Sequence, residues 1–563
     1  MVVGTTFGAD AGAREEDRSV IEQMLDSAHR ALADAPAPGD AAYLALPRLL
    51  HERLCRDWDE VLRANESDLT VARQRGHPEA LLGRMRLDPE DLSWLGELAR
   101  QVAAHLPSAL APGPELRGAS GVVTRRLPKP LGVLLAVYEA RPTVTVEAAL
   151  LAISAGNAVL LRGGKELART NGVMAGTVAS ALSDAGLPPG LAHVLDDPDR
   201  SLLRELLKRH DRIDALIPRG SPTLIDYCAE HSRIPVIASG GGVNHLYVHR
   251  AADVELAAEL VLDSKLPQPA GCTAVETVLV DGEVAGELVA ALLRRAAEPG
   301  TPRFALRLPP DQVRRFAPVA SGVDIDVADD GDNGREFLDR TLALRPVDGL
   351  DQAVRHIRRY GTGHTEGVIT ADTAVAERFC ARVDAACLVV NGSLRLDDGP
   401  TMGLGPELSI STGRLHVRGP VTLDALLTHS WVVHGNGATR EDHRAGKPAT
   451  VDAEQRGPVK ISRQVGRSTR EAVSAVVRRL VLRESRSPLS AEDIGEDEPL
   501  NGGTLRINSF GFVGMLVHLE DELDVRLPDD LFVGRRFETV GDLVDLVGSA
   551  CASGATGTEE ATG

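Results

Sequence analysis

The chain has 563 residues, too many for one hydrophobic core, so we expect two to four domains. A composition of 43% hydrophobic and 25% charged residues is typical of a globular protein in water. The formal net charge of −19 argues against DNA or RNA as a main partner. Because no apolar run reaches 18 residues and the N-terminus lacks a signal-peptide pattern, we expect neither membrane insertion nor export.

Residues 1–18 are small and acidic, and we expect a disordered N-terminus. From about 18 to 110, apolar residues recur at three- and four-residue steps, which predicts helices. From residue 121 the sequence pattern changes: short apolar runs alternate with segments of helical periodicity. The runs LGVLLAVYEA, NAVLLRGG, LAHVL and IDALIPRG predict strands of an α/β, doubly wound parallel sheet.

A second α/β block follows from about 245 to 420, with strand candidates TVLVDG, LALRPVDG, GVITAD and ACLVVNGS. The polar, Pro/Gly-punctuated segment 441–460 is typical of a linker. Beyond it, VGRSTREAVSAVVRRLVLRES, SFGFVGMLVHLEDEL and FETVGDLVDLVGSA predict the helices of a small bundle. The tail 551–563 has a disordered composition.

The cysteines are the first candidates for a metal site or a catalytic nucleophile. The six cysteines are scattered, with no CxxC pair and no Cys/His spacing for a metal, so we expect no metal site and a reducing, cytoplasmic setting: Cys55, Cys228, Cys272, Cys380, Cys387 and Cys551. In QPAGCTAVETVLV a Pro-Ala-Gly turn delivers Cys272 to the front of an apolar strand. From this stretch alone, Cys272 is either a small packed residue or a nucleophile.

Several long motifs, in order, resemble γ-glutamyl phosphate reductase of the aldehyde dehydrogenase superfamily. They are YEARPTVTVEAALLAISAGNAVLLRGGKE, IDALIPRGSPTLIDYCAEHSRIPVIASGGGVNHLYV, QPAGCTAVETVLV, YGTGHTEGVIT and GPELSISTGRLHVRGP. The resemblance implies a nucleotide-binding domain with N-terminal helices over 19–245, to which the chain returns near 405–440. It also implies a catalytic domain over 246–420 and a small oligomerisation flap, hence a homo-oligomer.

The resemblance implies NADPH-dependent reduction of an acyl phosphate to an aldehyde, with Cys272 as the nucleophile. A thiolate displaces phosphate and leaves an enzyme thioester, which hydride then reduces. The oxidising relatives carry a water-activating glutamate where this chain has ASGGGVN at 238–244. Its absence fits a reductase that must protect its thioester from water.

Other site residues follow from the matched loops. Those at 161–166 and 217–222 follow predicted strands, where such sheets bind ligands. Arginine binds phosphates well, and glycine lets backbone approach them. The resemblance places Glu407 near the nicotinamide ribose and Arg141 on the substrate phosphate. The expected cofactor-binding residues are Arg162, Gly163, Gly164, Lys165, Arg219, Gly220 and Glu407.

The C-terminal part, 461–550, resembles an acyl carrier protein through INSFGFVGMLVHLEDELDVRLPDDLF and FETVGDLVDLV. Ser509 falls at the serine that receives 4′-phosphopantetheine, although Asn508 replaces the usual aspartate. The alternative for Ser509 is an ordinary helix N-cap. A carrier implies a phosphopantetheinyl transferase, and an acyl-loading or glutamate kinase-like enzyme, as partners.

Three functions remain open at this point. In the first, the enzyme reduces γ-glutamyl phosphate or a close analogue, a reaction of proline and amino-acid biosynthesis. The carrier domain then serves a linked pathway of specialised metabolism. Alternatively, Cys272 accepts an acyl thioester tethered on Ser509, which a linker would hold at high effective concentration. Thirdly, the reductase part is inactive and the chain is a carrier scaffold.

Overall fold

The structure is a computed structural model that describes residues 7–118, 122–195, 200–435, 437–440, 470–485, 493–500, 505, 519, 523 and 538–554. The chain divides into two compact units. The larger holds residues 1–117 and 123–434, and the smaller holds residues 118–122 and 435–563. Within the described ranges, no helix is both long and apolar enough to cross a membrane.

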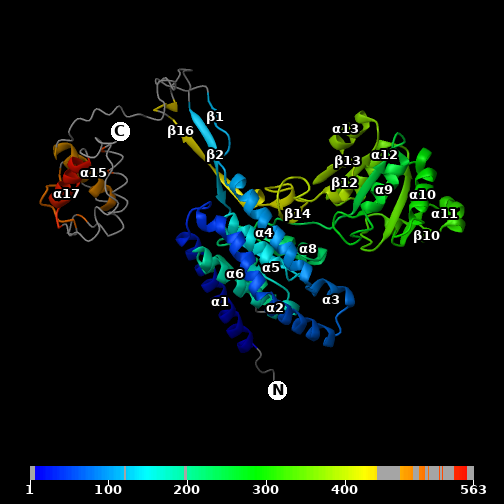
Figure 1. The fold of residues 1–563 in the computed structure, drawn as a ribbon, viewed down its shortest axis with the longest axis horizontal. Coiled ribbons are helices and arrows are strands. Elements are labelled where there is room, and N and C mark those ends of the chain that lie inside the picture. The colour runs from blue at the N-terminus through cyan, green and yellow to red at the C-terminus, as the bar shows by residue number, and fades with distance from the viewer. Residues whose placement is uncertain are drawn as a thin grey trace, which may run out of the picture. The chain divides into compact units, whose positions relative to one another are not determined.

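Four helices open the larger unit: α1 (Phe7–Asp34), α2 (Ala41–Gln74), α3 (Glu79–Met85) and α4 (Pro89–Ala109) (Figure 1). Helix α1 corrects one expectation, because residues 7–18 are helical where disorder was expected. Residues 13–16 read Ala-Arg-Glu-Glu, all strong helix formers, and later turns of the helix bury Ile21 and Leu25 in the core. The buried residues of the later turns therefore anchor a helix that begins earlier than the sequence pattern indicates.

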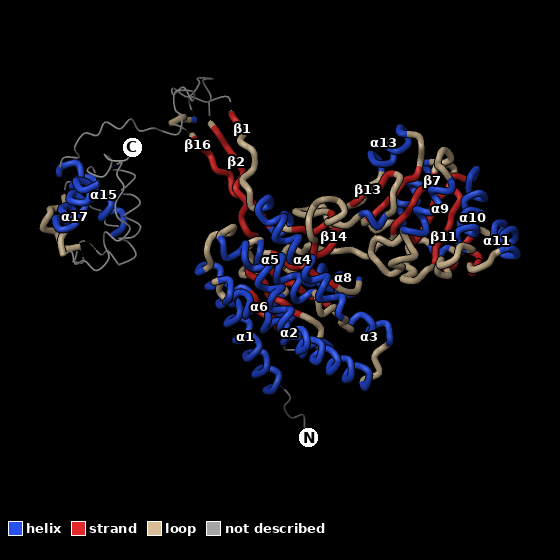
Figure 2. The backbone as a smooth tube through the Cα atoms, viewed as in Figure 1, coloured by secondary structure: helices blue, strands red, loops and turns tan. Residues whose placement is uncertain are grey.

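The four strands predicted first form one parallel sheet in the order β5-β4-β3-β6. Their bounds are β3 (Val133–Tyr138), β4 (Ala158–Arg162), β5 (Ala192–Leu195) and β6 (Ala215–Arg219). Strand β3 is buried along its whole length, as its unbroken apolar run requires. Helices among and after these strands are α5 (Val144–Ser154), α6 (Ala168–Ala185), α7 (Arg200–Leu206) and α8 (Pro222–His231) (Figure 2).

The second block is a seven-stranded parallel sheet in the order β10-β9-β11-β8-β7-β12-β13. Its strands are β7 (Asn244–Val248), β8 (Val275–Asp281), β9 (Phe304–Leu308), β10 (Val323–Val327), β11 (Thr341–Val347), β12 (Thr365–Ile369) and β13 (Cys387–Val390). Its helices are α9 (Val254–Asp263), α10 (Gly282–Ala296), α11 (Pro310–Phe316), α12 (Leu350–Tyr360) and α13 (Thr373–Arg382). The two parallel sheets give the α/β fold expected of an aldehyde dehydrogenase.

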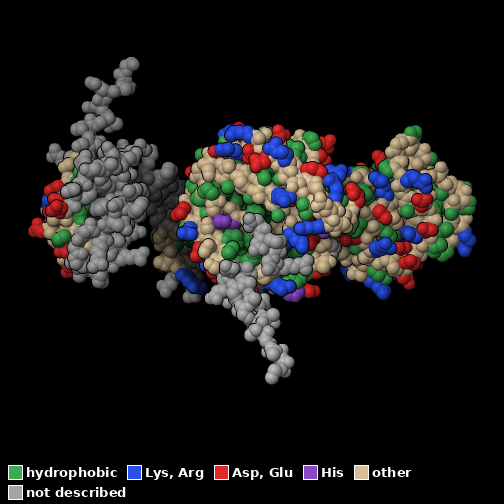
Figure 3. Space-filling model, turned by 90° about the horizontal axis from the view of Figure 1, so that it is seen from below, with side chains coloured by type: hydrophobic (Ala, Val, Ile, Leu, Met, Phe, Trp, Pro, Cys, Tyr) green, Lys and Arg blue, Asp and Glu red, His purple; other side chains and the backbone are tan. Residues whose placement is uncertain are grey.

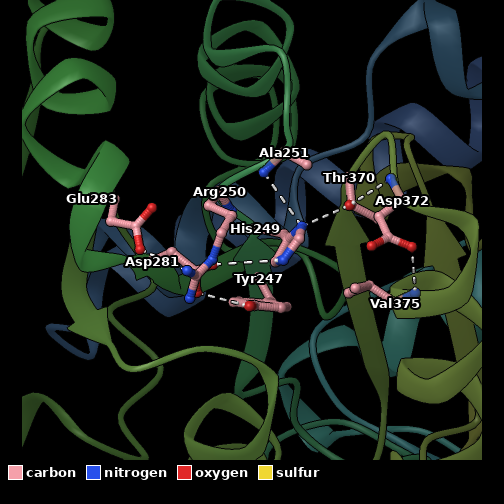
Figure 4. A network of polar contacts seen from close by, with 9 residues as sticks. All are labelled: Tyr247, His249, Arg250, Ala251, Asp281, Glu283, Thr370, Asp372 and Val375. Atoms are coloured by element: carbon pink, nitrogen blue, oxygen red, sulfur yellow. Dashed lines mark hydrogen bonds and ion pairs between the residues drawn. The ribbon is translucent and has the colours of Figure 1, made fainter.

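A polar network ties together the carboxyl ends of β7, β8 and β12 (Figure 4). The buried carboxylate of Asp281 accepts hydrogen bonds from the Tyr247 hydroxyl at 2.8 Å and from the Arg250 backbone N–H at 2.9 Å. His249 Nδ1 lies 2.9 Å from the Thr370 hydroxyl. Three strand ends are thereby fixed to one another.

Two small antiparallel sheets complete the larger unit. One pairs β1 (Leu116–Arg117), β2 (Val123–Pro130) and β16 (Leu427–His434), and the other pairs β14 (Glu407–Ser411) with β15 (Gly419–Thr422). Leu408, Val421 and Leu427 lie in the core cluster that contains β3 and β4, so the chain returns to the first sheet there. On β16, by contrast, Trp431 and Val433 are 55% and 60% exposed. Short 3₁₀ helices are η1 (Lys165–Leu167), η2 (Pro189–Leu191), η3 (Ala317–Val319), η4 (Asp330–Asp332), η5 (Leu394–Leu396) and η6 (Asp424–Leu426).

The smaller unit contains α15 (Arg470–Ser485) and α17 (Val540–Gly554). Their apolar side chains share one buried cluster, to which Val477, Leu480 and Val544 belong. Helix α17 continues to Gly554, so residues 551–554 are helical although they were expected to lie in the tail. The expected linker 441–460 and Ser509 lie outside the described residues.

Candidate active site

Cys272 lies in the turn between α9 and β8 and is exposed to solvent. Two turn hydrogen bonds shape this approach, from the Gly271 N–H to the Gln268 carbonyl and from the Ala274 N–H to the Gly271 carbonyl, both at 3.0 Å. Within the described chain, the Cys272 N–H donates to no protein acceptor. Thiol and free N–H thus belong to the same exposed residue, as a nucleophile with an adjacent oxyanion donor requires.

A buried ion pair closes the base of this turn. Lys265 Nζ lies 2.7 Å from Glu276 Oε2, and both residues are almost fully buried. Glu276 Oε2 also accepts the Phe337 N–H at 3.1 Å. Burial raises the pKa of Glu276 to about 7, against the opposing effect of Lys265, and burial lowers the pKa of Lys265. The pair fixes both ends of the segment that carries Cys272.

Asn244, the first residue of β7, holds the segment from inside. Its fully buried side-chain Nδ2 donates to the carbonyl of Cys272 at 2.7 Å and to that of Ala274 at 2.8 Å. Its Oδ1 accepts the Thr365 N–H from β12 at 3.1 Å. One amide therefore anchors the cysteine turn to two strands.

The glycine stretch 240–242 packs directly against the cysteine turn. A Cβ at Gly242 would lie 1.7 Å from the Cys272 carbonyl oxygen, so only glycine fits there. The Gly242 N–H donates to Glu336 Oε1 at 2.6 Å. Glu336, from the loop before β11, thus brings a carboxylate to the stretch that lacks one in the sequence.

Cationic and acidic groups set the electrostatics around the thiol. Burial raises the pKa of Cys272, the positive charge of Arg219 lowers it, and Glu407 and Asp397 raise it. Cys272 as a residue is exposed to solvent, but the protein around its thiol is dense enough to disfavour the charged form. Arg141 lowers the thiol pKa more weakly.

Arg219 is the last residue of β6 and lies within electrostatic reach of Glu147, Arg141, Cys272 and Glu407. Burial lowers its pKa, and its buried Nε has no hydrogen-bond partner among the described residues. An unpaired buried guanidinium N–H beside a thiol suits an anionic ligand. Arg219, predicted as a cofactor residue, therefore lies within electrostatic reach of Cys272.

Glu407 begins β14, and its Oε2 accepts the Gly399 N–H at 3.1 Å. Burial and the nearby Asp398 raise the pKa of Glu407 to about 7. The structure brings Glu407 within electrostatic reach of Cys272 and Arg219, as a member of the same cluster.

The predicted nucleotide loops follow β4 and β6, and both lie at the carboxyl end of the four-stranded parallel sheet. A Cβ at Gly163 would lie 2.2 Å from Asn171 Nδ2, and one at Gly164 would lie 2.0 Å from Glu166 Oε1. A Cβ at Gly220 would lie 2.7 Å from Glu139 Oε2. Packing thus leaves little room for a side chain at Gly163, whereas at Gly164 and Gly220 the nearest atoms are the ends of flexible glutamate side chains, which could move aside.

Lys165 lies beyond these glycines and lines a cavity of about 400 Å³ with Arg75 and His77. Arg162 ends β4 and lies near Cys228, whose pKa burial raises to about 11. The sequence did not point to Arg75 or His77, because both lie about 90 residues earlier, in the turn after α2.

Two histidines in matched motifs have structural roles. Burial lowers the pKa of His364 to about 4, and its Nδ1 lies 2.7 Å from the Thr365 hydroxyl. His416 Nε2 lies 3.0 Å from the Ala425 carbonyl. In the described ranges, no group of three His, Cys, Asp or Glu side chains could hold a metal ion.

Comparison with known proteins agrees with this geometry. A model of the aldehyde dehydrogenase family matches residues 31–303. The γ-glutamyl phosphate reductase of Symbiobacterium thermophilum is 41% identical over 429 residues, which cover 75% of this chain and 99% of that protein. The reductase of Xanthomonas campestris is 40% identical over 424 residues, covering 75% and 96%.

Solved structures show the same relationship. The crystal structure of γ-glutamyl phosphate reductase from Thermotoga maritima is 30% identical, with a TM-score of 0.68 over 74% of this chain and 99% of that one. An acetylating aldehyde dehydrogenase from Geobacillus thermoglucosidasius shares the fold at 17% identity and a TM-score of 0.55. The expected α/β, aldehyde dehydrogenase-like fold is confirmed, the C-terminal helical-bundle domain stays a prediction, and the chain belongs to the γ-glutamyl phosphate reductases of the aldehyde dehydrogenase family.

Proposed function

We propose that the chain reduces γ-glutamyl phosphate to the semialdehyde with NADPH, through a thioester on Cys272. The observation that carries the proposal is the solvent-exposed Cys272, whose N–H has no acceptor among the described residues. It lies within electrostatic reach of Arg219, whose buried Nε also has no hydrogen-bond partner among them. A reaction of this kind belongs to amino-acid biosynthesis in the cytoplasm.

The thiolate of Cys272 attacks the acyl carbon, the carbon–oxygen bond to phosphate breaks, and phosphate leaves. The Cys272 N–H donates to the oxygen that becomes negative. The positive charge of Arg219 stabilises the phosphate as it departs, and the exposed Arg141 is a second candidate to bind it. After reduction the carbon–sulfur bond breaks, the aldehyde leaves, and the sulfur returns to thiolate.

The chain also offers a site for a dinucleotide. Lys165 and Arg75 line a cavity at the carboxyl end of β4, and cations of this kind suit dinucleotide phosphates. When bound, the reduced nicotinamide supplies the hydride. Glu407, near the thiol, is the residue we assign to the ribose side of that site.

One experiment tests the nucleophile. The Cys272→Ala variant should bind the dinucleotide but reduce γ-glutamyl phosphate, generated in situ by a glutamate kinase, at least about 1,000-fold more slowly. Cys228→Ala is the matched control, because Cys228 is buried and its thiol pKa is raised to about 11. A Cys272→Ala enzyme that retains full turnover contradicts the mechanism.

The second candidate function uses the smaller unit as a carrier. Its support is the resemblance of 461–550 to acyl carrier proteins, together with the shared apolar cluster of α15 and α17. In this version Ser509 carries 4′-phosphopantetheine, and Cys272 accepts the acyl group from its thioester.

A homo-oligomer would form through the β-sheet that contains β16, where Trp431 is exposed.

Intact-mass measurement after co-expression with a broad phosphopantetheinyl transferase tests the carrier. Wild type should gain one phosphopantetheine, and Ser509→Ala should gain none. Turnover of free acyl phosphate by Ser509→Ala at the wild-type rate favours the first function over the tethered one. An unmodified wild-type chain rules out the carrier version.

A further inference from the structure

Three arginines form a cluster without carboxylate partners. Arg219 ends β6, Arg141 lies in the turn after β3, and Arg84 lies in the last turn of α3. Burial lowers the pKa of Arg84 and of Arg219, and the positive charge of Arg141 lowers both further. In the described part of the chain, none of the three forms an ion pair. Like charges gathered in this way are stabilised when an anion binds among them.

Backbone hydrogen bonding ties Arg219 to the stretch before Arg141. The Glu139 N–H donates to the Arg219 carbonyl at 3.0 Å. Arg141 precedes a proline, and a following proline disfavours helical backbone at the arginine. Strand β6 and the turn after β3 therefore present their arginines from fixed backbone positions.

Apolar packing brings α3 to the same turn. Ala140 is fully buried, with a φ of +46° in the left-handed region that alanine rarely adopts. It belongs to one apolar cluster with Leu82 and Met85, which lie on either side of Arg84 in α3. Strained backbone of this kind persists where the surrounding structure imposes it, and it is concentrated at ligand clamps. The cluster therefore holds Arg84 near Arg141.

The acidic groups of this region leave the arginines available. Glu139 Oε2 accepts the Ser221 N–H at 3.1 Å and the Ser221 hydroxyl at 2.9 Å. Glu147 is buried in α5, where burial raises its pKa, and it forms no ion pair with the described residues. Arg84 and Arg141 are both exposed, so an anion from solvent can reach them.

The influence of each arginine on the sulfur separates their roles. Arg219 is the strongest positive influence on the pKa of Cys272, Arg141 is a weaker one, and Arg84 is not among the principal charges. In an acyl phosphate the leaving phosphate is bonded to the carbon that the thiolate attacks, so it belongs near Arg219. A γ-glutamyl group carries its α-carboxylate at the other end of its carbon chain. Arg84, with the weakest influence on the sulfur, fits that second anion.

We propose that Arg84 binds the α-carboxylate of the glutamyl group and so selects acyl phosphates that carry a second anion at the far end of the chain. A guanidinium group binds a carboxylate through two parallel hydrogen bonds, which give geometric specificity as well as affinity. The proposal rests on the proposed reductase function, since it names the part of that substrate which Arg84 recognises. It gives the N-terminal helices a direct part in substrate binding, which none of the expected site residues does.

Substrates that differ in the far carboxylate test this assignment. Glutaryl phosphate carries it, and butyryl phosphate is the same acyl phosphate without it. Arg84→Gln should lower kcat/KM for γ-glutamyl and glutaryl phosphate at least about 10-fold, because a charge-assisted pair is worth roughly tenfold or more. The change for butyryl phosphate should stay below about 3-fold. Arg84→Lys should recover part of the loss, since it keeps the charge but not the two parallel bonds.

Arg86→Gln is the matched control. Arg86 lies two residues beyond Arg84 and is exposed, and it is not among the principal charges that act on Arg219 or Cys272. Its replacement should leave kcat/KM for both substrates at the wild-type value. Equal losses for glutaryl and butyryl phosphate in Arg84→Gln would assign Arg84 to the phosphate or to the fold, and would overturn the proposal. An unchanged preference for glutaryl phosphate also overturns it.

Calorimetry separates this proposal from the proposed function. The titrant is the phosphonomethyl ketone analogue of γ-glutamyl phosphate, in which a methylene group replaces the anhydride oxygen, and it is added to the full-length Cys272→Ala chain. If Arg84→Gln weakens its binding at least about 10-fold, but the wild-type chain reduces no acyl phosphate, the carboxylate site stands and the proposed function is removed. If the wild type reduces γ-glutamyl phosphate, but the analogue binds equally well with and without Arg84, the function stands and the carboxylate site is removed.

Discussion

Asn244 offers a direct test of how the cysteine turn is held. Replacing it with leucine keeps the side-chain size but removes three hydrogen bonds, to the carbonyls of Cys272 and Ala274 and from the Thr365 N–H. The Cys272 carbonyl can find water, because the turn is exposed. Ala274 and Thr365 are fully buried, so two polar groups lose their partners, at about 1–3 kcal/mol each. We therefore expect Asn244→Leu to lower the free energy of unfolding by about 2–6 kcal/mol.

Activity should fall further than stability explains. The turn that carries the sulfur loses its anchor to β7 and β12, and a displacement of about 1 Å at a reacting group can cost about 100-fold in rate. We expect kcat to fall about 10- to 100-fold at a temperature where the variant remains folded. Urea unfolding gives the stability, and steady-state kinetics with acyl phosphate gives the rate.

Asn65 supplies the control. Its buried amide, on helix α2, donates to the Met85 carbonyl at 2.8 Å and accepts the Leu87 N–H at 3.0 Å, and among the described residues it makes no hydrogen bond to the cysteine turn. Asn65→Leu should lose comparable stability and keep the wild-type kcat. If Asn244→Leu is destabilised but turns over at the wild-type rate, or if Asn65→Leu loses as much activity, the positioning role of Asn244 is wrong.

Two further predictions concern charge. Removing the positive charge in Arg219→Gln should raise the pKa of Cys272, and removing the negative charge in Glu407→Gln should lower it, because a thiolate is stabilised by cations and opposed by anions. The pH profile of iodoacetamide alkylation should therefore shift to higher pH in the first variant and to lower pH in the second; shifts of the same sign would contradict the assigned electrostatics. Asp281→Asn should lower the free energy of unfolding by about 1–3 kcal/mol, since it removes one acceptor oxygen from the buried network of Figure 4, while kcat/KM stays unchanged. Urea unfolding and steady-state kinetics check it, and an unchanged unfolding midpoint would show that the network carries little stability.

The fold was predictable where strands are buried on both faces. The runs that became β3 and β4 are continuously apolar, and the structure buries them as a central parallel sheet. One buried strand, β7, is an exception, because NHLYV was not among the predicted strands. Strands β9 and β10 were missed as well: Arg307 interrupts the apolar run FALRL, VDIDV alternates apolar with charged residues, and both lie toward one edge of the larger sheet. On the face drawn in Figure 3, acidic and basic side chains are mixed, as the scattered charges of the sequence imply.

The site was predictable only in part, for a physical reason. Cys272 and the loops after β4 and β6 are recognisable because each is a local motif. Asn244 meets the cysteine turn across 28 residues of sequence, and Glu336 meets Gly242 across 94, so only the folded chain brings these residues together. One signal was present: asparagine is disfavoured in strands, so Asn244 at the head of the apolar run HLYV is a buried polar residue that must bond to something.

The hydrogen bonds of Asn244 also determine which way the backbone of the turn faces. The amide binds the carbonyls of Cys272 and Ala274, while the Cys272 N–H has no acceptor among the described residues. We therefore expect the same side chain to position both the sulfur and the N–H that we propose as the donor for the developing oxyanion. Alkylation by iodoacetamide uses the sulfur but develops no oxyanion, whereas acyl transfer uses both. Asn244→Leu should consequently slow acyl phosphate reduction more than alkylation, and equal slowing would mean that the N–H contributes nothing to the reaction.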